Sequence, residues 1–87
     1  MEKFTVEQAR ALMPDRFKEM VEMIHERIRI AAENGLVEIV MAFDMKYNVN
    51  KAPWKVVHFL REEGYSVILS ILESKATLSF DISWRES

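Results

Sequence analysis

The two glycines of this 87-residue chain, Gly35 and Gly64, each separate a stretch of helical periodicity from a stretch rich in β-branched residues. Glycine favours the left-handed backbone conformation in which many helices end. Each glycine is therefore predicted to end a helix and to precede a strand. With glycine at these two positions alone, a glycine-rich phosphate-binding loop of either common kind is excluded.

The long helix is predicted by the apolar periodicity between Pro14 and Asn34. Apolar residues recur every three or four positions and form one stripe: Phe17, Met20, Val21, Ile24, Ile28 and Ala31. Charged residues fill the opposite side, with opposite charges at helical spacing, as in Glu26 and Arg29. The stripe is expected to face the core and the charged side to face solvent.

A short helix is predicted ahead of the long one. Thr5 and Gln8 have capping-box spacing, so this helix is expected to begin at about Val6. Pro14 lacks an amide donor and clashes with the preceding turn, yet it fits the first turn of a new helix. We therefore expect a kink at Pro14.

Three strands and a second helix are predicted in the rest of the chain. The strand-like segments are 36–43, 65–72 and 77–84, and the helix follows the first of them, with Asn50 as its cap and Pro53 in its first turn. Its predicted buried face is Pro53, Val56, Val57 and Leu60. The last two strands are separated by four residues, which is hairpin length.

Together these elements predict a single α+β domain over residues 1–87. A right-handed crossover makes the first two strands parallel, and the third then fits between them, antiparallel to both. The expected architecture has two layers: a long kinked N-terminal helix and a second helix packed on one face of a three-stranded, mainly antiparallel sheet. The expected strand order is first, third, second.

Composition narrows the class of protein. The formal net charge is −2, with 12 basic and 14 acidic residues mixed along the chain, which favours neither a polybasic nucleic-acid binder nor an acidic DNA mimic. The absence of cysteine excludes disulfides and thiolate metal sites and fits a reducing cytoplasm. No apolar stretch approaches the length of a membrane helix. We expect a soluble, cytoplasmic protein with no membrane partner.

No catalytic or metal-binding pattern is present in the sequence. His25 and His58 fall on different predicted helices, and no Cys accompanies either, so both are interpreted as surface or boundary residues. No serine lies in a glycine-flanked nucleophile turn. We expect no enzyme, no metal and no cofactor, the remaining catalytic alternative being Asp44 with Tyr47 beside a helix start.

The segment from Met45 to His58 contains no acidic residue. Its lysines and aromatic residues could grip a nucleic-acid strand through phosphate contacts and base stacking; they are Lys46, Lys51, Lys55, Tyr47 and Trp54. Solvated lysines and a partly buried Trp54 are the preferred interpretation, because three charges are few. Nucleic-acid binding through this segment stays an alternative.

Surplus apolar surface is the most informative feature for function. Met23 and Ile30 lie off the main stripe of the long helix. The first strand is mostly apolar on both faces, which predicts at least partial cover on both sides. Because two helices cover only one face of a sheet, the remainder must be exposed, shielded by the N-terminal segment or buried against another chain. A protein interface, self-association included, is favoured. Its candidate residues are Met41, Tyr47, Trp54, Val40, Ile68, Met23 and Ile30.

The order of features along the chain resembles that of small proteins encoded by tailed bacteriophages. The resemblance rests on a helix that ends in Ala31, Ala32 and Gly35, a following strand, and then two groups: Leu60, Gly64, Tyr65 and Val67, and the closing Ile82, Ser83 and Trp84. These are helix ends and core positions, so the resemblance carries fold and no functional residue. It implies a viral accessory protein in the host cytoplasm or a virion component.

The leading hypothesis is a non-enzymatic protein-binding module that binds and inhibits a host defence protein and forms a homo-oligomer. The first alternative is a virion structural or assembly protein that packs against itself or a capsid or tail subunit. The second is weak nucleic-acid binding through residues 46–55.

Overall fold

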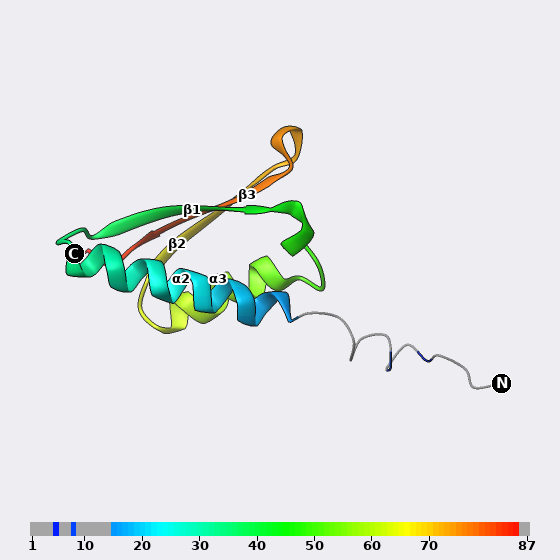
Figure 1. The fold of residues 1–87 in the computed structure, drawn as a ribbon, viewed down its shortest axis with the longest axis horizontal. Coiled ribbons are helices and arrows are strands. Elements are labelled where there is room, and N and C mark those ends of the chain that lie inside the picture. Colours follow the sequence, from blue (N-terminus) through cyan, green and yellow to red (C-terminus); the bar gives the residue numbers. More distant parts are fainter. Residues whose placement is uncertain (1–4, 6–7, 9–14, 86–87) are drawn as a thin grey trace.

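The computed structural model describes residues 5, 8 and 15–85 and shows an α+β fold. Two helices pack on one face of a three-stranded sheet (Figure 1). The elements are α2 (Arg16–Glu33), β1 (Glu38–Asp44), the 3₁₀ helix η1 (Met45–Tyr47), α3 (Ala52–Glu62), β2 (Ser66–Leu72), the 3₁₀ helix η2 (Glu73–Lys75) and β3 (Thr77–Ser83).

Helix α2 has the predicted stripe at its buried face. Its start is capped by Asp15, whose side chain accepts a hydrogen bond of 3.0 Å from the amide of Lys18. Its buried residues are Met20, Val21, Ile24, Ile28 and Ala31, with Phe17 partly buried against the core. It ends as predicted, because Gly35 has a φ of 80° and its amide donates to the carbonyl of Ala32 at 3.0 Å.

The capping box ahead of α2 is confirmed. The amide of Thr5 donates to Gln8 Oε1 at 2.8 Å, and the amide of Gln8 donates to Thr5 Oγ1 at 3.1 Å. The predicted helix start at Val6 and the kink at Pro14 lie outside the described residues.

Helix α3 has the predicted buried face, extended by Ala52, and it ends at Gly64, whose φ is 102°. The prediction that Asn50 caps it is wrong. The N-cap is Lys51, which has a left-handed φ of 59° and makes no side-chain cap. Asn50 is also left-handed, so the chain closes a turn in which the amide of Ala52 donates to the carbonyl of Val49 at 2.8 Å. The helix therefore begins one residue later than predicted.

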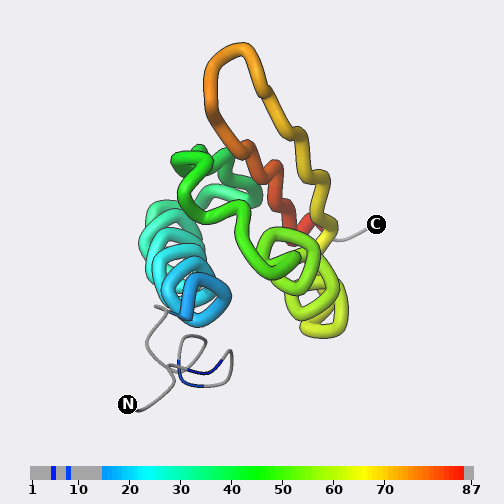
Figure 2. Tube along the Cα trace, turned by 90° about the vertical axis from the view of Figure 1, so that its right-hand side faces the viewer, coloured from blue at the N-terminus to red at the C-terminus, as the bar shows by residue number. Residues whose placement is uncertain are grey.

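The sheet has the predicted order β1-β3-β2, with β3 in the centre and antiparallel to both neighbours. The two edge strands are therefore parallel to each other. In the register, Val40 of β1 and Ile68 of β2 both lie opposite Asp81 of β3. Helix α2 packs against β1 and α3 against β2, and Figure 2 shows the two helices side by side below the sheet.

The two faces of the sheet differ sharply in burial. The face toward the helices carries Leu78, Phe80 and Ile82 of β3, all with 0% exposure. On the opposite face Val40 is 69% exposed and Ile68 64% exposed. The expectation that the first strand is covered on both sides is therefore wrong for the part of the chain that the structure describes, because both helices lie on the same side.

Candidate protein-binding surface

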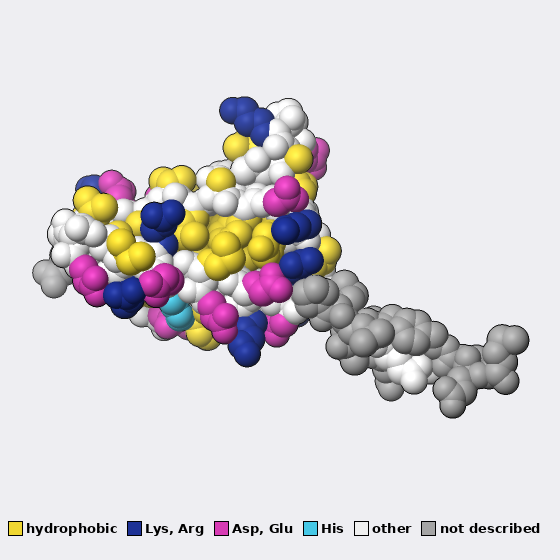
Figure 3. Space-filling model, viewed as in Figure 1, with side chains coloured by type: hydrophobic (Ala, Val, Ile, Leu, Met, Phe, Trp, Pro, Cys, Tyr) yellow, Lys and Arg dark blue, Asp and Glu magenta, His cyan; other side chains and the backbone are white. Residues whose placement is uncertain are grey.

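Four of the seven predicted interface residues meet along a groove between α2 and β1. Two adjoining hollows, of about 520 and 540 Å³, lie there and share Arg27 and Ile30. We call this the α2–β1 groove and define it by Met23, Arg27 and Ile30 on the helix and by Leu36, Val40 and Met41 on the strand side. Figure 3 shows apolar side chains gathered in a band between the helix and the sheet, bordered by charged ones.

The helical wall of the groove is a second stripe on α2. Met23, Glu26, Arg27 and Ile30 are related by offsets of three, four and seven residues, so they share one side of the helix. Met23 is 46% exposed and Ile30 40% exposed. This side is rotated away from the buried stripe, and it faces the space beside β1 because α2 packs against that edge strand.

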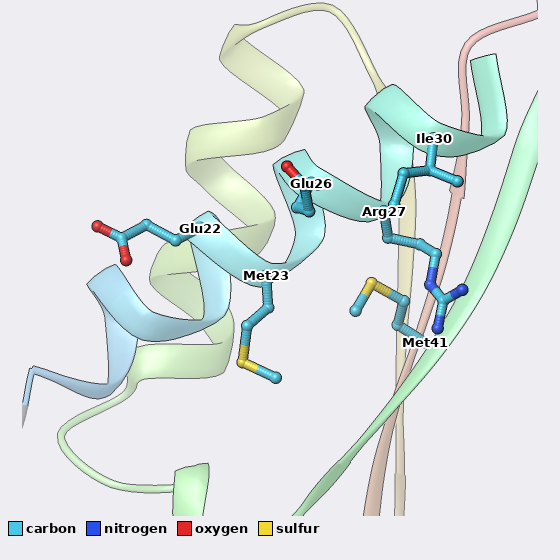
Figure 4. A pocket seen from close by; sticks show the side chains of 6 residues that line it. All are labelled: Glu22, Met23, Glu26, Arg27, Ile30 and Met41. Atoms are coloured by element: carbon cyan, nitrogen blue, oxygen red, sulfur yellow. The ribbon is translucent and has the colours of Figure 1, made fainter. Parts of the chain in front are cut away.

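The charges of this stripe are arranged differently from those on the solvent side of α2. Arg29 hydrogen-bonds to both Glu26 and Glu33. Its hydrogen bond holds the pKa of the Glu26 carboxyl below the usual value, so Glu26 is negatively charged near neutral pH. Among the described residues, Arg27 takes part in no ion pair. Figure 4 shows its guanidinium reaching toward β1, close to Met41.

The outer edge of β1 supplies unpaired backbone groups beside the groove. The amide of Met45 donates to the carbonyl of Ala76, and the amide of Trp84 donates to the carbonyl of Val37. Backbone polar groups alternate in direction along an antiparallel strand, so odd-numbered residues of β1 bond to β3. The amides and carbonyls of Glu38, Val40 and Ala42 point the other way, and within residues 15–85 no strand pairs with them.

The outer edge of β2 is partly occupied. By the same alternation Val67, Leu69 and Ile71 direct their backbone groups away from β3. The Arg61 guanidinium of α3 donates to the carbonyl of Val67 at 2.9 Å. A charged side chain bound to an edge carbonyl obstructs the approach of another strand.

The other three predicted interface residues lie elsewhere. Tyr47 is half-buried, with its ring edge-on to Phe43 at 5.3 Å. Trp54 is 50% exposed on α3, and Ile68 is exposed on the open face beside the opposite edge. The structure does not bring these three residues into the α2–β1 groove.

The residues of the nucleic-acid alternative are exposed but show no prepared stacking surface. Lys46, Lys51 and Lys55 are all exposed. The ring of Tyr47 already carries Lys46 at 5.4 Å and Arg16 at 5.2 Å from its centroid. A base could stack on this ring only by displacing those cations, so no observation favours this function.

Two of the side chains considered for catalysis or metal binding make structural contacts. His25 Nε2 lies 2.7 Å from Glu63 Oε1, which joins α2 to α3. The carboxylate of Asp44 accepts a hydrogen bond of 2.9 Å from the amide of Lys46 and so closes the turn into η1. Among the residues that the structure describes, no three His, Asp or Glu side chains could hold one metal ion.

Within the described part of the chain, neither helix combines the length and the apolar character that crossing a bilayer requires.

The sequence patterns predict four apolar members of the groove but not Arg27, Leu36 or the free edge. Arg27 could have been found, because it lies four residues after Met23 and three before Ile30 on the same side of the helix. Leu36 was assigned to the strand, whereas it follows the turn at Gly35 and lines the end of the groove. Which edge is free depends on the bond from Arg61 to Val67, which no local pattern indicates.

Comparison of the chain with protein-family models, with curated proteins and with solved structures yields no match.

Proposed function

We propose that this chain is a non-enzymatic protein-binding module that docks a partner strand along β1 and over the α2–β1 groove. The single observation that carries the proposal is the α2–β1 groove, lined by apolar and charged side chains, directly beside an unpaired strand edge. In strand addition, backbone hydrogen bonds supply affinity and pockets for alternate side chains supply specificity. This surface offers both.

The chemistry of the groove defines the partner strand. Side chains on one face of an added strand would lie over the wall formed by Met23 and Ile30, so they should be apolar. The acidic Glu26 and the basic Arg27 lie between those two apolar residues. Glu26 is already paired with Arg29, so Arg27 is the side chain of this stripe that gains a counter-charge from an acidic group on the partner.

The resemblance to small bacteriophage proteins supports a narrower form of the proposal. In this form the module acts in the host cytoplasm, where it binds a host defence protein and inhibits it. The alternative partner is a capsid or tail subunit, with the chain as a virion component. Stoichiometric amounts of the chain in purified virus particles would select the alternative, and its absence from them would favour the inhibitor.

Capture experiments with two matched variants test the proposal. Val40→Lys places a charge at the β1 edge, and Ile68→Lys places the same charge in the same row of the open face at the β2 edge. Both parent side chains are more than 60% exposed, so neither change should unfold the domain. A partner should bind the parent chain and Ile68→Lys and be lost with Val40→Lys. Equal capture by both variants would contradict the proposal.

A further inference from the structure

We propose that the strand docking on β1 belongs to a second copy of this chain. In this homodimer two β1 strands pair antiparallel about a two-fold axis at Val40, and the two α2 helices pack alongside each other. The inference rests on the proposed function, and a second copy would compete with a host or virion protein for this one strand edge. It would join two three-stranded sheets into one continuous sheet of six strands.

The free edge of β1 can pair with the same edge of a second copy in one favourable antiparallel register. With Val40 opposite Val40 of the second copy, Glu38 lies opposite Ala42 and Ile39 opposite Met41. The outward amides and carbonyls of Glu38, Val40 and Ala42 then meet their counterparts, which gives about six backbone hydrogen bonds. A shift that centres Met41 would place Glu38 opposite Asp44, two like charges, and a shift that centres Ile39 would shorten the overlap.

The second stripe of α2 is complementary to itself when reversed. Along the helix it reads apolar, acidic, basic, apolar: Met23, Glu26, Arg27 and Ile30. In an antiparallel pair of these helices Met23 faces Ile30 of the second copy, and Glu26 faces Arg27 of the second copy. Two apolar contacts and two opposite-charge contacts result, with no like charges opposed. A stripe with both charges of one sign would repel its own copy.

The strand pairing and the helix pairing place the two-fold axis at a similar distance from the turn between α2 and β1. Arg27 and Val40 line the same hollow. Counted from the turn at Asn34 to Leu36, the midpoint between Glu26 and Arg27 lies about 11 Å along α2, and Val40 lies about 13 Å along β1. One axis therefore satisfies both pairings, which two unrelated surface features would not be expected to do.

The β2 edge and the open face of the sheet lack this self-complementarity. The β2 edge carries the Arg61 guanidinium on its Val67 carbonyl. The open face has the polar residues Thr77, Ser79, Asp81 and Ser83 along its central strand, so two open faces would bring carboxylates of Asp81 together. The α2–β1 groove is therefore the surface whose chemistry a second copy satisfies best.

Sedimentation equilibrium of the purified full chain tests the dimer with no other protein present. The parent chain and Ile68→Lys should be dimers with dissociation constants within about twofold of each other. Val40→Lys should weaken the dimer at least about tenfold, because it places two lysines opposite each other at the axis. Circular dichroism should show that both variants stay folded. A parent chain that is monomeric up to about 1 mM, or a dimer that Ile68→Lys breaks and Val40→Lys does not, overturns the proposal.

Charge exchange on α2 tests the helix contact. Arg27→Glu opposes two pairs of carboxylates across the axis and should weaken the dimer about tenfold. Adding Glu26→Arg to Arg27→Glu restores opposite charges, so the double variant should dimerise more tightly than the single one. A double variant as weak as Arg27→Glu alone would overturn the helix pairing.

The outcomes separate this inference from the proposed function. A parent chain that stays monomeric, yet captures another protein in a way that Val40→Lys abolishes and Ile68→Lys does not, overturns the homodimer and leaves the binding surface intact. If the parent chain is monomeric and Val40→Lys does not change which proteins it captures, both the homodimer and the proposed binding surface are overturned.

Discussion

The two edge strands of the sheet are alike in several ways but differ in how they are protected. β1 and β2 each have seven residues and each pairs with β3 over its full length. Each also carries one exposed apolar residue opposite Asp81. Arg61 binds an outward carbonyl of β2. Among the described residues no side chain donates to the outward carbonyls of β1, and an apolar groove lies beside it.

The difference between the edges originates in the helices below them. Near its C-terminal end α3 has a long cationic side chain that reaches the β2 backbone. At the equivalent flank of α2, Arg27 is bordered by the apolar side chains of Met23 and Ile30. An exposed strand edge invites pairing with other chains, and proteins commonly block it with charge. The comparison teaches that one edge has a cationic side chain on one of its outward carbonyls, while the other combines pairing groups with apolar surface.

The largest effect is expected from a substitution in the core of the central strand, which lies between the two edge strands. Phe80 is fully buried in the central strand and packs edge-on against Phe43 at 5.7 Å. Phe80→Ala should lower the free energy of unfolding by about 3–5 kcal/mol, because it leaves a cavity below both edges. Urea unfolding followed by circular dichroism measures this loss. A change of less than about 1 kcal/mol would show that the two helices do not depend on this residue for packing.

A disulfide test reads the register of the β1 edge directly, since the chain has no cysteine of its own. In Val40→Cys the two cysteines would lie opposite each other at about 5.5 Å between Cα atoms, within the range of a disulfide. In the matched variant Ala42→Cys they would be about 13 Å apart along the strands. Oxidation should therefore link Val40→Cys into a covalent dimer and leave Ala42→Cys monomeric on a non-reducing gel. Comparable linking of both variants would contradict the register.

A smaller effect is expected from changing the groove wall alone. Ile30→Glu changes an exposed side chain, so the free energy of unfolding of the monomer should change by less than about 0.5 kcal/mol. Binding at the β1 edge should weaken by about 1–2 kcal/mol, because a carboxylate replaces apolar area in the contact. Isothermal titration or sedimentation gives the dissociation constant. The change Leu72→Glu, at an exposed apolar residue of β2, serves as the control and should leave binding unchanged.

The smallest expected change sharpens the comparison by exposing the protected edge. Arg61→Ala removes the hydrogen bond to the Val67 carbonyl and should lower stability by about 1 kcal/mol. It also frees the β2 edge, so this variant should form species larger than the parent assembly at high concentration. Adding Ile68→Lys should suppress those species. If Arg61→Ala assembles like the parent chain, the guanidinium is not what protects β2.

Much of the fold follows from local sequence patterns. The helix ends at Gly35 and Gly64 and the alternation over residues 77–84 are local signals, and the crossover rule turns them into the observed strand order. The cap at Asn50 was misassigned because two consecutive left-handed residues displaced the helix start. That conformation depends on how the chain returns from η1 to α3, which a capping preference alone does not determine.

The α2–β1 groove was predictable in part. The surplus apolar residues Met23, Ile30, Val40 and Met41 were visible as departures from a single stripe or a single face, and the structure brings all four together. Tyr47 and Trp54 are predicted because they are large aromatic residues, a criterion that carries no information about position, and Ile68 is predicted from the second apolar face of its strand, which lies at the opposite edge of the sheet. The contrast between the two edges depends on how helix α3 is placed beside β2. This placement lets the Arg61 guanidinium reach the carbonyl of Val67, six residues further along the chain.

Amide hydrogen exchange at the two edges tests the central claim most directly. The amides of Val40 and Ala42 at the β1 edge and of Leu69 and Ile71 at the β2 edge are predicted to point outward in the same way. As protein concentration rises, exchange should slow at Val40 and Ala42 and stay fast at Leu69 and Ile71, because only the β1 edge pairs with another strand. Slowing at Leu69 and Ile71, with Val40 unchanged at every concentration, would contradict this account.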